Sequence, residues 1–259
     1  MTEARMRVLI GYSCCPVTLE AFERAGIEAW TCDVLPSRGR PDRHLQCDVW
    51  EVANDRWDAG LFHPMCTYLT VSAAWAFNDP DFDRYPGVGY HQKVKPGTLT
   101  GEARREARRE AIENFQRLLS LPYPKAIENP ANSFVNKAIR PPDQRIQPFH
   151  FGDDGSKMTG LWLDRLPRLR PTAFAEPRRV PRELASGKSD RNNAVDSCAG
   201  ERADLFGAGL MRWANQTDTG QNNASPGEDR WLERSKTWPG IADAFGSQWG
   251  GYLVRREAA

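Results

Sequence analysis

The sequence lacks several features that would place it in a common class. Its 259 residues contain no apolar run near the length of a membrane span, about 18 residues. The first residues have no signal-peptide layout, because their apolar run is short and merges into an expected strand. The net charge is only +1, so any contact with nucleic acid must come from a local basic patch. We therefore expect a globular cytoplasmic protein without a membrane partner.

Cysteine is sparse, and its spacing does not suit metal binding. The six cysteines are Cys14, Cys15, Cys32, Cys47, Cys66 and Cys198. They form no CxxC pair and no Cys/His cluster with ligand spacing, so we expect no zinc or other metal site. Without a signal peptide they are expected to be reduced thiols, most of them small buried side chains.

The N-terminal third alternates between strand-like and helix-like segments. Residues 18–26 have helical spacing of apolar side chains, with Thr18 as the expected N-cap and Gly26 at the end. Short apolar runs predict strands at residues 7–12, 27–34, 44–49 and 57–64. This order is typical of an α/β protein with a doubly wound, mostly parallel sheet.

Downstream segments extend the same pattern and then change in composition. The sequence predicts a helix from about residue 100 to 121 and strands at 124–130 and 157–167. Residues 78–101 are rich in Pro, Gly and Asp and are expected to form a loop or lid. We expect a catalytic domain at 1–167, a loop-rich insertion at 168–229 that could recognise a target, and a C-terminal turn and helix at 230–259.

Four candidate functional groups fall where predicted strands end. They are Asp33, Asp48, Cys66 and Glu128. Because open parallel sheets bind ligands beyond the carboxyl ends of their strands, we expect these groups to share one rim. Carboxylates after the second and third strands suit the hydroxyls of a ribose and the amino edge of an adenine. Each of the four also has an ordinary interpretation, as a turn carboxylate or a half-buried thiol.

Several motifs, in order, resemble those of a known family. The sequence DAGLFHPMC at 58–66 ends an apolar strand in a Pro-x-Cys loop, and ENP follows at 128–130. The passages at 146–172 and 234–249 add two longer matches. Together they resemble DNA (cytosine-5) methyltransferases, and more closely the short, often phage-borne relatives of these enzymes. The resemblance implies a class I, Rossmann-like methyltransferase fold that acts in a bacterial or phage-infected host cell.

The resemblance also implies a reaction and a set of site residues. A thiolate at Cys66 would add to carbon 6 of a flipped-out cytosine, and Glu128 would stabilise the adduct at ring N3. The implied cofactor is S-adenosylmethionine (SAM), and the implied partner is DNA. The candidate cofactor residues are Gly11, Tyr12, Asp33, Val34, Asp48, Val49 and Pro64, and the candidate substrate residues are Thr67, Lys157, Arg168 and Arg170.

Departures from the family pattern keep other functions open. The first loop, GYSCCPVT, has Pro16 where a Gly is common, and Met158 stands where an Arg is frequent. The chain could instead transfer another group from a modified SAM, such as a carboxylated one, or act on a free nucleotide. It could also bind DNA without catalysis. His63 could face the site or be a satisfied histidine, and the arginines of residues 104–117 are expected mainly on a solvated helix face.

Overall fold

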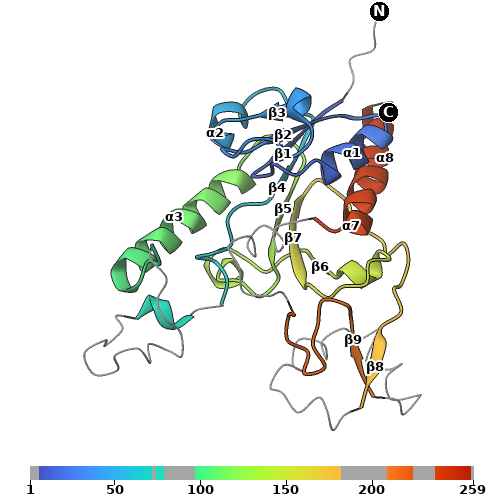
Figure 1. Ribbon diagram of the computed structural model, residues 1–259. Coiled ribbons are helices and arrows are strands. Elements are labelled where there is room, and N and C mark those ends of the chain that lie inside the picture. Colours follow the sequence, from blue (N-terminus) through green and yellow to red (C-terminus); the bar gives the residue numbers. More distant parts are fainter. Residues whose placement is uncertain (1–5, 72–73, 79–96, 182–208, 224–236, 258–259) are drawn as a thin grey trace, which may run out of the picture.

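The computed structural model describes residues 6–71, 74–78, 97–181, 209–223 and 237–257. Seven strands form one sheet in the order β3-β2-β1-β4-β5-β7-β6 (Figure 1). Their bounds are β1 Arg7–Gly11, β2 Glu28–Cys32, β3 His44–Leu45, β4 Ala59–Phe62, β5 Lys125–Pro130, β6 Gln144–Ile146 and β7 Thr159–Asp164. All neighbouring pairs are parallel except those of β7, which runs antiparallel to both β5 and β6. This is a Rossmann-like α/β fold with a doubly wound, mostly parallel sheet, as the sequence predicted.

Helices cover both faces of the sheet (Figure 1). The helical segments are α1 Val17–Arg24, α2 Val49–Val52, α3 Gly101–Leu119, α4 Val135–Ala138, α7 Pro239–Ala244, the π-helical η7 Phe245–Gly250 and α8 Gly251–Glu257. Val8 and Ile10 of β1 pack with α1 and the C-terminal helices, whereas Leu9 packs with α2 and α3. Because alternate strand residues face opposite sides, the central strands are buried on both faces, and the edge that remains for a ligand is their carboxyl end.

Two local predictions were wrong. Helix α1 begins at Val17 after Pro16, and Thr18 is buried within its first turn instead of capping it. The third strand is only two residues long, and Asp48 lies beyond it as the N-cap of α2. Asp48 and Glu51 form a capping box there, so this carboxylate follows the strand but belongs to a helix start.

The C-terminal helices return to the first helix. A Cβ atom on Gly246 would lie 2.2 Å from the backbone oxygen of Ala21, so η7 packs against the backbone of α1. Within the expected insertion, the described residues include a small two-stranded antiparallel sheet of β8 Arg178–Val180 and β9 Leu210–Arg212 (Figure 1). Residues 182–208 and 224–229 of that segment, and residues 79–96 of the expected lid, lie outside the described residues. The division into three domains stays a prediction.

Candidate active site

The Cys66 loop, residues 64–70, continues from β4 at the carboxyl edge of the sheet. The carbonyl oxygen of Cys66 accepts hydrogen bonds from the backbone amides of Leu69 (3.0 Å) and Thr70 (2.9 Å). These two bonds close one tight turn that starts at the cysteine. The Cys66 side chain is exposed, and so are its neighbours Met65 and Thr67. The turn therefore holds the backbone of a thiol that remains accessible to a substrate.

The end of β5 is hydrogen-bonded to the Cys66 loop. The side-chain amide of Asn129 donates a hydrogen bond of 3.1 Å to the carbonyl oxygen of Pro64, and both residues are buried. Phe134 closes the contact further along, because its amide donates to the carbonyl oxygen of Leu69 at 2.7 Å. The Glu-Asn-Pro segment at the end of β5 and the Pro-x-Cys loop, which are far apart in sequence, thus form one connected edge of the site.

Glu128 lies in a cluster with His63 and Lys157. Phe62 is paired with Ile127 across β4 and β5, so the next residues, His63 and Glu128, are neighbours at the strand ends. His63 Nδ1 lies 2.6 Å from Glu128 Oε2, and Lys157 Nζ lies 4.0 Å from Glu128 Oε1. Only 18% of the Glu128 side chain and 14% of the His63 side chain are exposed. We call these three side chains the Glu128 cluster.

The cluster keeps Glu128 ionised. Burial favours the neutral acid, but the charge of Lys157 and the hydrogen bond from His63 outweigh it and lower the pKa of Glu128 to about 2. The carboxylate is therefore available to accept a hydrogen bond from a ligand, while His63 is the nearest group able to supply it with a proton. The sequence left His63 open between a site residue and a satisfied histidine, and the structure pairs it with Glu128.

The first loop leaves β1 in an unusual conformation. Tyr12 has a φ of 58°, in the left-handed region that few non-glycine residues adopt. Its hydroxyl donates a hydrogen bond of 3.0 Å to Asn114 Oδ1 on α3, and burial, with a further contribution from Asp48, raises its pKa to about 12. The Tyr12 side chain is thus held toward α3, and any cofactor contact at this position would come from the backbone.

Gly11, the residue before Tyr12, lies very close to the side chains of Phe62 and Val49. A Cβ atom there would lie 2.6 Å from the Phe62 ring and 2.8 Å from Val49 Cγ2. Val49 is itself buried and belongs to the core under the first loop. The glycine therefore allows the strand end to pack against its neighbours where the loop begins.

Asp33 and Asp48 follow β2 and β3 at the same edge of the sheet. Asp33 Oδ1 accepts a hydrogen bond of 2.9 Å from the Leu35 amide, and Asp48 Oδ1 accepts one of 2.8 Å from the Trp50 amide. Each interaction uses one carboxylate oxygen and orients the side chain. Val34, between Asp33 and Leu35, is 65% exposed. The two strand ends thus present two oriented carboxylates, which accept hydrogen bonds, and one exposed apolar residue.

Two arginines of α3 donate hydrogen bonds to backbone carbonyl oxygens of the Cys66 loop. The sequence did not indicate this contact. Arg104 is only 4% exposed, and its Nη2 donates to the carbonyl oxygen of Thr67 at 3.3 Å. Arg108 Nε donates to the carbonyl oxygen of Tyr68 at 3.1 Å, and its guanidinium lies over the rings of Phe77 and Phe134. Burial and the charge of Arg104 lower the pKa of Arg108 to about 10. The expected solvated face is therefore correct for Arg109 but wrong for these two.

Arg168 and Arg170 are exposed but lie apart from the Glu128 cluster. Leu169 exchanges two hydrogen bonds with the side chain of Gln144 on β6, and β7 separates β6 from β5. The backbone of Arg170 also exchanges two hydrogen bonds with the side chain of Gln248 on η7. Lys157 is brought to Glu128, whereas these two arginines are held beside β6 and the C-terminal helix.

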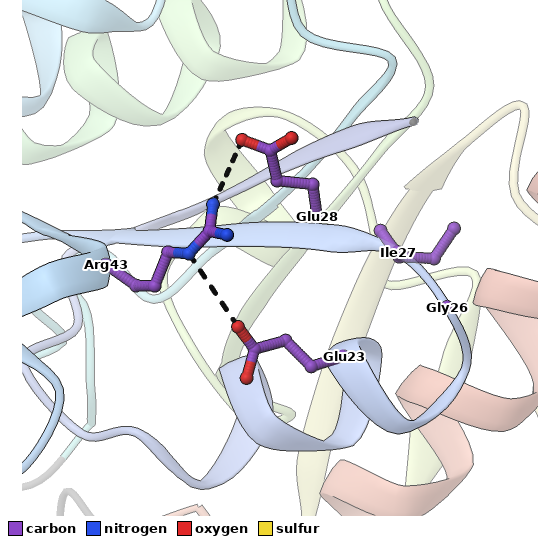
Figure 2. Close-up of a pocket in the computed structure, with 5 residues that line it drawn as sticks. All are labelled: Glu23, Gly26, Ile27, Glu28 and Arg43. Atoms are coloured by element: carbon purple, nitrogen blue, oxygen red, sulfur yellow. Dashed lines mark hydrogen bonds and ion pairs between the residues drawn. The ribbon is translucent and has the colours of Figure 1, made fainter. Parts of the chain in front are cut away.

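A hollow of about 260 Å³ lies elsewhere on the sheet, and its residues do not belong to the candidate site (Figure 2). It is lined by Glu23, Gly26, Ile27, Glu28 and Arg43. Figure 2 shows Arg43 bridging the two carboxylates, at 3.0 Å from Glu28 and 3.9 Å from Glu23. Glu28 is the first residue of β2, whereas the candidate site lies at the strand's carboxyl end. The acidic side chains here are neutralised by arginine, and we assign no ligand to this hollow.

Two searches of the described part of the chain had negative results. No group of three or more His, Cys, Asp or Glu side chains in it has an arrangement that could hold a metal ion. No helix in the same residues is both long and apolar enough to cross a membrane.

Comparisons with known proteins gave structural neighbours of low similarity. No protein-family model and no curated protein sequence matches the chain. The crystal structure of the Dnmt2 methyltransferase from S. pombe aligns with 98% of this chain and 97% of its own, at 14% identity and a TM-score of 0.39. A mutant of DNMT2 from Spodoptera frugiperda aligns with 98% of both chains, at 10% identity and a TM-score of 0.32.

Proposed function

We propose that this protein transfers a methyl group from SAM to carbon 5 of cytosine in DNA through a covalent adduct at Cys66. The observation that carries the proposal is the connected edge formed by the Cys66 loop and the end of β5, with Glu128 beside it. An exposed thiol and a buried carboxylate on adjacent strands of a methyltransferase-type sheet are suited to this chemistry. The sequence resemblance to cytosine-5 methyltransferases supports the same assignment.

The side chains divide the reaction between them. The Cys66 thiolate adds to carbon 6 of the ring, and the electron pair moves toward N3, which becomes basic. The Glu128 cluster stabilises the adduct at N3, and carbon 5 then becomes the nucleophile. The reaction ends when the carbon-5 proton leaves and the thiolate is eliminated. Because carbon 6 and carbon 5 are buried within a duplex, the cytosine has to leave the base stack before Cys66 can reach it.

The carboxylates after β2 and β3 fit the nucleoside part of SAM. Asp33 accepts a backbone hydrogen bond from Leu35, and Asp48 accepts from the backbone at the start of α2, so both carboxylates are oriented by local contacts. Carboxylate oxygens can accept from ribose hydroxyls and from an adenine amino group. When bound, SAM would supply the electrophilic methyl group. The chain would contribute these two acceptors, the exposed Val34 and the backbone of Gly11 and Tyr12 at the loop.

A DNA substrate is favoured by exposed basic side chains on the segment that leads from β7 through β8. Arg168, Arg170 and Arg179 are exposed there. Exposed arginines can neutralise phosphates, and such binding becomes weaker as the salt concentration rises. The net charge of +1 confines such binding to a patch. We therefore place the DNA backbone along the segment from β7 to β8.

The proposal is tested by mass spectrometry of nucleosides from the DNA of cells that express the chain. Wild-type protein is expected to produce 5-methylcytosine, and Cys66→Ser is expected to produce none. Cys47→Ser removes a half-buried thiol that lies 3.8 Å from the Cys32 sulfur, and it serves as the matched control that should retain the product. A product with a different added mass would support transfer of another group from a modified SAM.

Trapping with duplex DNA that contains 5-fluorocytosine tests the nucleophile directly. In the presence of SAM, wild-type protein is expected to form an adduct that survives denaturation, and Cys66→Ser is expected to form none. An adduct in the Cys66→Ser protein would rule out this thiol. Calorimetry with SAM distinguishes the enzyme from the non-catalytic alternative. A protein that binds DNA but does not bind SAM would be a DNA-binding protein that retains only the fold. If the protein modified free deoxycytidine nucleotide but not DNA, the substrate would be the free nucleotide.

A further inference from the structure

The Glu128 cluster raises a question about the proton that the cytosine ring needs. Once Cys66 adds to carbon 6, ring N3 becomes basic and takes up a proton. Glu128 is the nearest acid in the proposed mechanism, yet the charge of Lys157 and the hydrogen bond from His63 keep it ionised, with a pKa of about 2. A carboxylate can accept a proton or pass one on, but it cannot be the source of the first one. The proton has to come from a group that already touches it.

His63 is that group. Its Nδ1 lies 2.6 Å from Glu128 Oε2, a distance typical of a strong charge-assisted hydrogen bond. The backbone amide of His63 donates to the carbonyl oxygen of Gly11 at 3.1 Å, so the residue is anchored to β1 at the start of the first loop. The ring is mostly buried, and the parallel register of β4 and β5 places it beside the carboxylate before any substrate arrives.

The other ring nitrogen is not committed to the protein. His63 Nε2 is buried and has no hydrogen-bond partner among the described residues. No carbonyl or carboxylate of that part of the chain therefore fixes the tautomer of the ring from the far side. Glu128 is its hydrogen-bonding partner, and proton movement within this pair is the chemistry that the geometry favours.

We propose that His63 supplies the proton that reaches cytosine N3 and that Glu128 relays it. Before the reaction, His63 carries both ring protons and Glu128 is ionised. As the Cys66 sulfur–carbon 6 bond forms, Glu128 Oε2 takes the Nδ1 proton of His63, and the carboxyl group that results gives this proton to N3. The ring keeps its Nε2 proton and becomes neutral, and Glu128 is again a carboxylate. On elimination of the thiolate, the N3 proton returns along the same path.

This role rests on the proposed function and makes His63 a positioning and relay residue, because it acts on the substrate through Glu128. Lys157, which precedes β7, also contacts the carboxylate, at 4.0 Å from Glu128 Oε1. Beyond Gly11 the titratable groups are Tyr12 and Cys14, and burial raises the pKa of both, so they stay neutral at neutral pH. In the proposed reaction Cys66 acts as a thiolate, because the thiolate is the nucleophilic form of cysteine.

The relay predicts a specific pH profile. The rate should rise with pH as Cys66 ionises and fall at higher pH as the His63–Glu128 pair loses its transferable proton. His63→Asn keeps an amide that can donate a hydrogen bond to Glu128 but removes the transferable proton. We expect this variant to be slower by about 10²-fold at neutral pH, the usual size of a general-acid contribution. We also expect the descending, high-pH limb of the variant's pH–rate profile to vanish or to move by more than about one pH unit.

The experiment follows tritium release from DNA of mixed sequence that is tritiated at carbon 5 of cytosine, without a methyl donor. Adduct formation at carbon 6 allows exchange of the carbon-5 hydrogen, so the assay needs neither a known target sequence nor a bound cofactor. The same profile is measured for wild type, His63→Asn and the matched control His150→Asn. The His150 ring packs against the rings of Phe149 and Phe174, and its loss should leave the profile unchanged. Thermal unfolding of each variant checks that it is folded.

The outcomes separate the relay from the reaction. Active wild type, with His63→Asn slowed and its descending limb changed, supports the relay. A His63→Asn rate equal to that of wild type overturns it. A uniform slowing with an unchanged limb also overturns it, because a purely structural role would act in that way. If wild type releases no tritium and modifies no nucleoside at any pH, the proposed function fails, and the relay fails with it.

Discussion

The side-chain amide of Asn129 donates a hydrogen bond of 3.1 Å to the carbonyl oxygen of Pro64, which joins the residue after Glu128 to the loop that carries Cys66. The bond lies in a buried setting, where a carbonyl left without a donor costs free energy. It therefore fixes the distance between the two ends of the proposed site. The sequence resemblance singled out the Glu-Asn-Pro motif, and in the structure the asparagine of this motif links the end of β5 to the Cys66 loop.

Loss of this bond should affect catalysis more than stability. Asn129→Ala is expected to lower the free energy of unfolding by about 1 kcal/mol, the usual net value of one hydrogen bond. It should slow adduct formation with 5-fluorocytosine DNA by about 10- to 100-fold, because small misplacements of reacting groups are costly. The measurements are urea unfolding and the rate of adduct formation.

Asn136 offers a matched control for that change. Asn136 is in α4, and its side-chain amide donates a hydrogen bond of 2.9 Å to the carbonyl oxygen of Ala131 instead of Pro64. Asn136→Ala should lose comparable stability and keep the wild-type rate of adduct formation. If the two variants were equally slow, the Asn129–Pro64 bond would have no special role in placing Cys66.

Ionisation of Glu128 makes a pH-dependent contribution to stability. Its pKa is lowered from 4.5 to about 2 because Lys157 and His63 outweigh the effect of burial. A carboxyl group with a lowered folded-state pKa stabilises the native state above its unfolded-state pKa and loses that contribution as the pH falls toward the folded value. At 1.36 kcal/mol per pKa unit, the full contribution is on the order of 3 kcal/mol.

Glu128→Gln tests this contribution. The difference in unfolding free energy between wild type and the variant should be largest near pH 6 and should shrink as the pH falls from about 4.5 toward 2. Urea unfolding at pH 6, 4.5 and 3 measures it. A constant difference across these three values would mean that Glu128 has an ordinary pKa and that its cluster does not hold it ionised.

The arginines behind the Cys66 loop give a prediction about loop support. Arg104→Met keeps the apolar stem but removes the donors to the carbonyl oxygens of Thr67 and Leu99, both at 3.3 Å. It should lower the free energy of unfolding by about 1–3 kcal/mol, because two partly buried hydrogen bonds from a charged donor are lost. Arg109→Met on the same helix removes exposed ion pairs to Glu102 and Glu106 and should change stability by less than about 0.5 kcal/mol. Thermal and urea unfolding compare the two, and equal losses would contradict the supporting role of Arg104.

The doubly wound, mostly parallel sheet and the carboxyl edge of its strands could be predicted because they depend on local patterns. Short apolar runs ending in Asp33, Asp48 and the Cys66 loop located the carboxyl edge of the sheet, and the observed strands agree with them to within a few residues. The short strand β6 was missed, because Gln144–Ile146 has only one buried apolar residue and depends on pairing with β7. A strand of that kind is defined by its partner and has no period of its own.

The partners of polar side chains were much harder to predict. Arg104 and Arg109 are both arginines of α3, yet Arg104 is buried and the side chain of Arg109 is 53% exposed. The difference arises from what packs against α3, namely the Cys66 loop and the ring of Phe77. In the same way, nothing in the sequence near His63 indicates Glu128, which is 65 residues away. Such pairs exist only after the sheet has brought strand ends together.

The return of the C-terminal helices to α1 supplies the final prediction. A Cβ atom on Gly246 would lie 2.2 Å from the backbone oxygen of Ala21, and backbone cannot move aside as a flexible side chain does. Gly246→Ala should therefore lower the free energy of unfolding by about 1–3 kcal/mol through overpacking. At Gly251, five residues later, the nearest atom to an added Cβ is the flexible tip of Arg255 at 3.3 Å. Gly251→Ala should be neutral or raise stability by about 0.5 kcal/mol, as alanine does in a helix. Urea unfolding measures both, and a tolerated Gly246→Ala would mean that the C-terminal helices do not pack closely against α1.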